Sequence, residues 1–162
     1  MGITSALDRL KLVLQIQKHQ SKMKGTWGCS VERVTDFLQR NLHMGQYVPL
    51  FEQKQIDGDL LLVATDEILR EIGIVSALDR LKIRIHFKRE MSGGLSALAE
   101  KYSVDKVIAL LKENNMSAKY QVAIEEHEID GELLTEASCD VFQEIGIKSI
   151  LHQTAIQELI QK

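Results

Sequence analysis

The side chains best suited to bind a metal or to transfer protons are histidines and cysteines, and they are scattered along the chain. They are His19, Cys29, His43, His86, His127, Cys139 and His152. None of them stands at the short spacings that zinc ligands show in sequence. The two cysteines also lack a CxxC partner, so we expect reduced thiols and a cytoplasmic protein. The sequence therefore predicts no metal site.

Other catalytic signatures are equally weak. Asp57-Gly58-Asp59 resembles the first positions of a calcium loop, but the later ligands and the closing glutamate do not follow, so we interpret it as a turn. No serine lies in a G-x-S-x-G setting, and neither G-x-G-x-x-G nor a P-loop occurs. We therefore predict a non-enzymatic protein with no cofactor and no small-molecule substrate.

Charged side chains form the clearer pattern. Arg80, Arg84 and Lys88 recur every four residues, which places them on one face of a helix. A later segment is crowded with carboxylates at Glu125, Glu126, Glu128, Asp130, Glu132 and Glu136. Residues 26–91 hold nine basic and ten acidic residues, net −1, whereas residues 98–162 hold six and twelve, net −6. Such complementary patches can guide protein association, although each charge can also be ordinary solvated surface.

These charges lie within an internal repeat. Ile56-Asp57-Gly58-Asp59-Leu60-Leu61 recurs as Ile129-Asp130-Gly131-Glu132-Leu133-Leu134, an offset of 73 residues. The same offset relates Glu71-Ile72-Gly73-Ile74 to Glu144-Ile145-Gly146-Ile147. A partial third copy opens the chain, because nine of the ten residues 2–11 are identical to residues 73–82. We interpret it as the last helix of an earlier repeat, either in a fragment of a longer protein or in a natural short isoform.

Apolar residues at helical spacing predict five helices in each full copy and an orphan helix from about Ser5 to Gln20. Residues with capping side chains mark the expected helix starts, namely Ser30, Thr65, Ser76, Ser103 and Ser138. Gly73 and Gly146 are expected in the left-handed position that ends a helix. The predicted buried stripe of the last helix is Ile74, Leu78, Leu81 and Ile85 in the first copy, and Ile147, Leu151, Ile156 and Leu159 in the second. The orphan stripe of Ile3, Leu7, Leu10 and Leu14 requires cover from the first bundle or from a neighbouring chain.

The residues themselves resemble the sterile alpha motif (SAM) family. The resemblance rests on Trp27 before the first helix, on Phe51 to Leu62, and on Glu71-Ile72-Gly73-Ile74 before a long amphipathic helix. It implies an all-α fold of two consecutive five-helix SAM bundles. We expect an orphan helix and linker at 1–25, a first domain at 26–91, a linker at 92–97 and a second domain at 98–162. The tandem is similar to that of SARM proteins, and the extra upstream helix to a liprin-like triple array.

The resemblance also implies a scaffold that associates with itself or with other SAM proteins. SAM domains pair an acidic mid-loop surface with an end-helix surface at the start of the fifth helix. For the first domain the end-helix residues would be Val75, Ser76, Arg80, Arg84 and Lys88. For the second domain the mid-loop residues would be Glu125, Glu126, Glu128, Asp130, Glu132 and Glu136. We expect the first patch to meet the second on a neighbouring chain.

RNA-hairpin binding is the alternative function, since some SAM domains bind RNA through basic residues near the fifth helix. The candidates here are Arg80, Lys82, Arg84, Lys88 and Arg89. The net charge of −3 opposes this alternative, because neutralising phosphates dominates such affinity. No apolar run approaches the ~20 residues that a membrane helix needs, so we expect no membrane partner.

Overall fold

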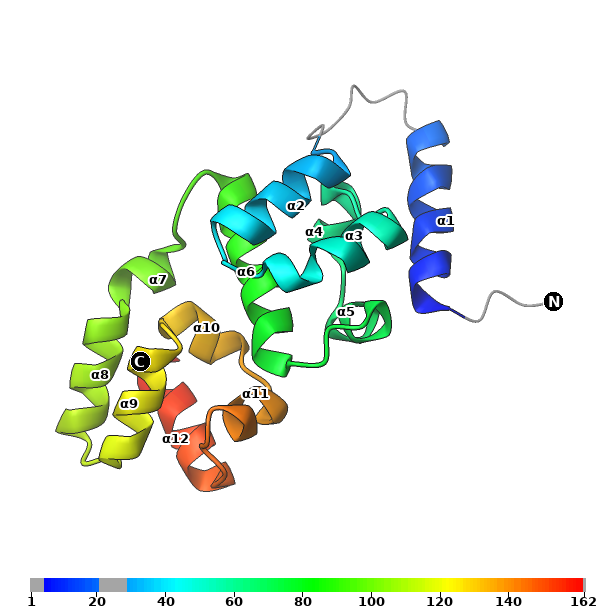
Figure 1. Cartoon of the computed structure of the whole chain (residues 1–162). Helices are drawn as coiled ribbons and strands as arrows, with labels where there is room; N and C mark the ends of the chain where they lie inside the picture. The colour runs from blue at the N-terminus through cyan, green and yellow to red at the C-terminus, as the bar shows by residue number, and fades with distance from the viewer. Residues whose placement is uncertain (1–4, 21–28, 162) are drawn as a thin grey trace. The chain divides into compact units, whose positions relative to one another are not determined.

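The computed structural model describes residues 5–20 and 29–161, and every regular element within these ranges is a helix (Figure 1). The predicted all-α fold is therefore confirmed. The chain divides into two compact units, Met1–Val75 and Ser76–Lys162. Trp27 and Ile3, which the sequence analysis singled out, lie outside the described residues.

Unit 1 begins with the orphan helix and continues with the first four helices of the first full copy. Its elements are α1 (Ala6–Gln20), α2 (Val31–Arg40), η1 (Gly45–Tyr47), α3 (Val48–Lys54), α4 (Gly58–Val63) and α5 (Asp66–Ile72). The start of α1 agrees with the expected orphan helix. Two predicted caps are confirmed: the side chain of Ser30 accepts from Arg33 N, and that of Thr65 accepts from Ile68 N.

The core of unit 1 is formed by the apolar stripes of its short helices. Val34, Leu38, Phe51, Leu61 and Leu69 are among the residues that are almost fully buried. Helix α5 ends at Gly73, whose φ of 121° is accessible to glycine at little cost. Helix α1 packs on α4 and α5 of this unit, where Leu7 is buried and Leu10 and Leu14 are half-buried.

Unit 2 begins with the last helix of the first copy and continues through the whole second copy. Its elements are α6 (Ala77–Ser92), α7 (Ala97–Lys101), α8 (Val104–Glu113), α9 (Ala118–Glu126), α10 (Gly131–Glu136), α11 (Cys139–Glu144) and α12 (Ile150–Gln161). The sequence analysis did not predict α7. Ser96 caps it by accepting from Ala99 N, and Ala99 is buried.

Helix α6 shares one hydrophobic core with the second copy. Ala77, Leu78, Leu81 and Ile85 belong to the same cluster as buried residues of α8 to α12. The stripe that we expected α6 to use within the first copy therefore packs into the core of unit 2. Arg80, Ile83 and Phe87, on the opposite face of α6, are also buried. Because α6 is buried on two opposite faces, the spacing of its apolar residues does not show which partner covers which face.

The boundary between the units falls before α6, although by sequence α6 is the fifth helix of the first copy. The domain boundaries expected from the repeat, 26–91 and 98–162, stay a prediction. None of the described helices is long and apolar enough to cross a bilayer.

Candidate protein-interaction surfaces

The first turn of α6 is held by a carboxylate from α11. Ser76 Oγ donates to Glu144 Oε1 at 2.5 Å, and Ala77 N donates to Glu144 Oε2 at 2.7 Å. Leu78 N lies 3.2 Å from the same Oε2. Helix N-termini favour anions because their first N–H groups lack partners within the helix. Glu144 therefore binds α6 by satisfying these donors.

The first turn of α1 repeats this contact in unit 1. Ser5 Oγ donates to Glu71 Oε1, and Ala6 N donates to Glu71 Oε2 at 2.9 Å. The hydrogen bond from Ser5 and others from the backbone hold the pKa of Glu71 below its ordinary value. Because Glu71 and Glu144 are equivalent in the repeat, unit 1 binds the first turn of α1 in the same manner as unit 2 binds that of α6.

Farther along α6, a buried pair of ionic contacts joins the helix to α10. Arg89 Nη2 lies 2.8 Å from Asp130 Oδ2, and Arg89 Nε lies 2.7 Å from Glu132 Oε2. The exposed fractions of the three side chains are 8%, 13% and 14%. Asp130 Oδ1 also accepts from Leu133 N and so caps α10. Two carboxylates thus neutralise one guanidinium in a nearly dry position, where each is costly to leave unpaired.

Sequence reasoning missed this role of Arg89, which it named only as an RNA-binding candidate. The sequence did contain a signal for this role, namely the spacing of Arg89 from the apolar residues of α6. Leu78, Leu81, Ile85 and Arg89 follow one another at intervals of three or four residues, so Arg89 continues the face that enters the core of unit 2.

Two stretches of the chain match a family of known proteins. Residues 26–89 and residues 100–162 each match a model described as SAM domain (Sterile alpha motif). The chain belongs to the SAM domain family. SAM domains are generally protein–protein interaction modules rather than catalysts. The searches of curated proteins and of solved structures find no match.

The first SAM match includes α6, so the contacts of Ser76 and Arg89 join the end helix of the first SAM domain to the second SAM domain. The residues expected on this end helix differ in exposure. Val75 is 88% exposed, Lys88 is exposed and Arg84 is half-buried, whereas Arg80 is only 2% exposed. The basic surface that remains accessible on the end helix is therefore formed by the exposed Lys88 and the half-buried Arg84.

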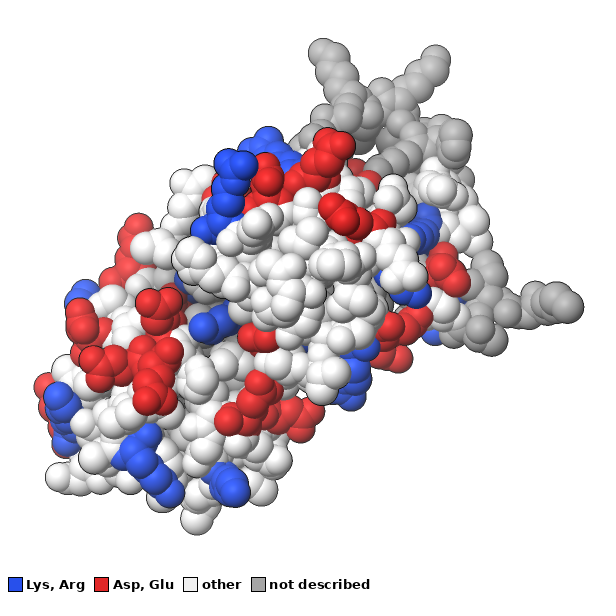
Figure 2. Space-filling model, viewed as in Figure 1, with Lys and Arg blue, Asp and Glu red and all other residues white. Residues whose placement is uncertain are grey.

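The acidic mid-loop residues of the second SAM domain divide into two groups. Asp130 and Glu132 are engaged by Arg89 within the chain. The other four are exposed: Glu125, Glu126, Glu128 and Glu136. Figure 2 shows acidic side chains gathered on the viewed face of this unit, over the region of α9. An exposed acidic surface therefore remains next to the occupied pair.

The basic residues that suggested RNA binding are largely withdrawn from solvent. Arg80 and Arg89 are buried. Burial lowers the pKa of Lys82 from its ordinary value, against smaller opposing effects of Glu128 and Asp79. Burial, reinforced by Arg89, also lowers the pKa of the neighbouring His86. His86 is therefore neutral at physiological pH and adds no positive charge to this face.

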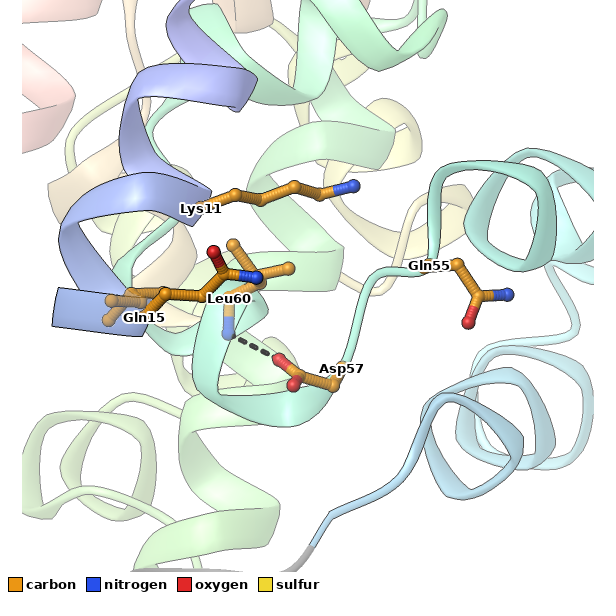
Figure 3. Close-up of a pocket in the computed structure, with 6 residues that line it drawn as sticks. Lys11, Gln15, Gln55, Asp57 and Leu60 are labelled. Atoms are coloured by element: carbon orange, nitrogen blue, oxygen red, sulfur yellow. Dashed lines mark hydrogen bonds between the residues drawn. The ribbon is translucent and has the colours of Figure 1, made fainter. Parts of the chain in front are cut away.

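In unit 1, a groove lies beside the contact of α1 with α4, which is equivalent to the contact of α6 with α10. A groove of about 250 Å³ lies between α1 and the turn before α4, lined by Lys11, Leu14, Gln15, Gln55, Asp57 and Leu60. Figure 3 shows Lys11 and Gln15 reaching from α1 toward the segment of Asp57, whose carboxylate accepts from Leu60 N. A groove of similar size, about 260 Å³, lies beside the contact of α6 with α10 in unit 2, where Arg89 and Glu132 are among its lining residues.

No group of three or more potential ligand side chains that could hold a metal ion occurs among the described residues. Cys29 is buried and Cys139 is exposed, with no disulfide between them.

Proposed function

We propose that this chain is an interaction scaffold that associates with itself through SAM end-helix and mid-loop surfaces. The observation that supports the proposal most is the contact of α6 with α10 and α11. It places the end helix of one SAM domain against the carboxylates of the mid-loop region of the next, with Arg89 on Asp130 and Glu132. The glutamate contact at the first turn of the helix occurs in both units, and separate chains can form it in the same way.

The charges that remain accessible supply the surfaces for association between chains. The exposed Lys88 and the half-buried Arg84 lie on the end helix of the first domain, and four exposed glutamates lie around α9 and α10 of the second. Opposite charges on different patches of one chain join head to tail, so the resulting assembly closes into a ring or extends as a filament. Complementary electrostatic potentials on the two patches raise the rate at which chains associate and fix how the chains align with each other.

The test is the solution mass from light scattering at low and high salt. We expect a mass above the 18.3 kDa of one chain that falls as salt increases, because exposed ion pairs are screened. The double variant Arg84→Glu with Lys88→Glu should lose this association. The matched control is Arg33→Glu with Arg40→Glu, which changes charge equally on exposed residues of α2 and should keep it. A monomer at every concentration and salt would refute self-association.

A further inference from the structure

The first turn of α12 carries two large apolar side chains in solvent. Ile150 is 71% exposed and Leu151 is 81% exposed. The 73-residue repeat relates them to Ala77 and Leu78 of α6, which are 5% and 4% exposed. This overturns the expectation that Leu151 belongs to the buried stripe of α12. Gln153, Ile156 and Ile160 instead form its buried side.

The two earlier copies show what covers this position. The first turn of α6 hydrogen-bonds to Glu144 and the helix packs on α11, whereas the first turn of α1 hydrogen-bonds to Glu71 and the helix packs on α5. We call these two contact regions, α11 with Glu144 and α5 with Glu71, the Glu144 surface and the Glu71 surface. Ser149 of α12 stands where Ser76 and Ser5 stand. It also accepts from the backbone N–H three residues later, that of His152 at 3.4 Å, as Ser76 accepts from Asp79 N at 2.9 Å. The first turn of α12 is therefore preshaped for the same glutamate contact.

Charge favours a carboxylate partner more strongly at α12 than at the two earlier helices. The first turns of α1 and α6 contain Asp8 and Asp79, whereas the first turn of α12 contains no acidic residue. His152 takes the place of Asp79, and its Nδ1 lies 2.9 Å from the hydroxyl of Tyr120. Lys148 precedes the turn and is exposed. A glutamate that docks here meets no competing carboxylate in the helix terminus.

Only one of the two glutamate surfaces in the chain is readily vacated. Helix α6 cannot leave Glu144 without removing four apolar side chains from the core of unit 2 and breaking the buried contacts of Arg89. Helix α1 contributes Leu7 as its one buried side chain among residues 5–16. Leu12, Val13 and Ile16 of α1 are exposed.

We propose that the first turn of α12 docks on the Glu71 surface of a second copy of this chain, where it displaces α1. The docking residues are Ser149, Ile150 and Leu151. Helix α1 then acts as a tethered plug that limits association until it is released. The inference rests on the proposed function, because it takes the chain to be a self-associating SAM protein, but it uses surfaces other than Arg84 and Lys88.

The contact is confined to the first turn of α12. Thr154 and Glu158 stand where α6 has Leu81 and Ile85, so the later turns offer no apolar stripe. A short contact of this kind is weak, and a tethered competitor has an effective concentration of order millimolar. The plugged chain should therefore associate by this route only slightly.

The experiment releases the plug in the full chain with Leu7→Asp and measures mass by light scattering over a range of concentrations. A buried charge in place of Leu7 detaches α1. We expect the mass of this variant to rise with concentration well above that of the unaltered chain at the same salt, and to return to that of the unaltered chain in Leu7→Asp with Leu151→Asp. Adding Glu71→Lys to Leu7→Asp should abolish the association equally.

Two controls separate docking from unspecific exposure of apolar surface. Leu12→Asp alters an exposed residue of α1 and should leave the mass unchanged. Leu7→Asp with Val122→Asp, which changes an exposed apolar residue of α9 instead of Leu151, should still associate. Circular dichroism confirms that each variant remains folded.

The outcomes distinguish this inference from the proposed function. If Leu7→Asp does not associate while the unaltered chain still forms salt-sensitive oligomers, the plug is wrong and the scaffold function stands. An association of Leu7→Asp that survives Leu151→Asp would overturn the assignment to α12. If every form is monomeric at all salt concentrations, both proposals fail.

Discussion

Helices α1 and α6 begin with nearly the same sequence and donate to equivalent glutamates, but their later turns differ. Helix α6 places Leu78, Leu81 and Ile85 in the core of unit 2 and ends on the buried contacts of Arg89. In α1, Leu7 is buried, while the equivalents of Leu81 and Ile85, Leu10 and Leu14, are only partly buried. The first turn thus sets the position of the docked helix, and the later turns set how firmly it stays.

The difference has a structural consequence for each unit. The second SAM domain has incorporated the preceding helix into its own core, so α6 is part of that fold. The first SAM domain holds α1 by a glutamate contact, one buried leucine and a few polar contacts, such as that from Lys11 Nζ to Lys54 O. The same contact is therefore an integral element in one unit and a removable attachment in the other.

The largest effect should come from breaking the buried ionic contact that only α6 makes. Arg89→Ala leaves Asp130 and Glu132 nearly buried without their cation, which should lower the free energy of unfolding by about 3–5 kcal/mol. Urea denaturation measures this loss. Arg70→Ala is the control, because its ion pair with Asp66 has side chains 59% and 42% exposed and should cost about 0.5 kcal/mol or less. Equal losses in the two variants would contradict the account.

Truncation of the equivalent leucines should separate an integral helix from an attached one. Leu78→Ala removes a side chain from the core cluster and should cost about 2–5 kcal/mol in the unfolding of unit 2. Leu7→Ala should instead loosen α1 and leave the main urea transition nearly in place. Limited proteolysis would show this as faster cleavage within α1. A shared loss of global stability would mean that α1 is as integral as α6.

Gly131 allows a smaller and more local test of how tightly unit 2 is packed. A Cβ at this position would lie 2.5 Å from Tyr102 Cβ, and Gly131 N already donates to Tyr102 O at 2.8 Å. Gly131→Ala should therefore destabilise by about 1–3 kcal/mol through overpacking. In the matched Gly45→Ala, the new Cβ would meet only Gln39 Cγ at 3.8 Å, so little change is expected in thermal unfolding. If Gly131→Ala left the stability unaltered, Tyr102 and its neighbours would have to shift at little cost in free energy.

Acid should release α1, as the smallest of these effects. The pKa of Glu71 is lowered in the folded chain, chiefly by the hydrogen bond from Ser5, so ionised Glu71 favours the docked state. This contribution is present above the ordinary pKa of 4.5 and is lost as pH falls through the lowered value. Protection factors of α1 amides should decrease below about pH 4.5. The variant Glu71→Gln should show low protection without that pH dependence; an unchanged acid response would exclude Glu71 as its cause.

Much of the fold was predictable because local signals in the sequence agree with the packing. The side chains of Ser30, Thr65, Ser76 and Ser138 cap helices as expected, and Gly146 has the expected positive φ of 87°. Ser103 precedes α8 as predicted, but its side chain makes no capping hydrogen bond. The internal repeat also predicted which helices of the two copies are equivalent.

The partner of each helix face was not predictable in the same way. Periodicity identifies Leu78, Leu81 and Ile85 as an apolar stripe, but it does not say which copy covers them. In α12 the stripe was placed on Leu151, Ile156 and Leu159, whereas Ile156 is buried, Leu159 is half-buried and Leu151 is exposed. Arg80 looks like a surface residue by type but is buried. Long-range packing decides all of these positions, and a single sequence contains no direct record of it.

The most direct test of the account is native-state hydrogen exchange of the unaltered chain, comparing amides of α1 with amides of α6. If α6 is integral to its unit and α1 is an attachment, α6 amides should exchange only through global unfolding. Their exchange rates should then depend on urea concentration as strongly as those of amides in the core of unit 2. Amides of α1 should exchange faster, through a local opening that urea hardly affects. Equal protection and equal urea dependence in the two helices would contradict the account, because α1 would then be held as firmly as α6.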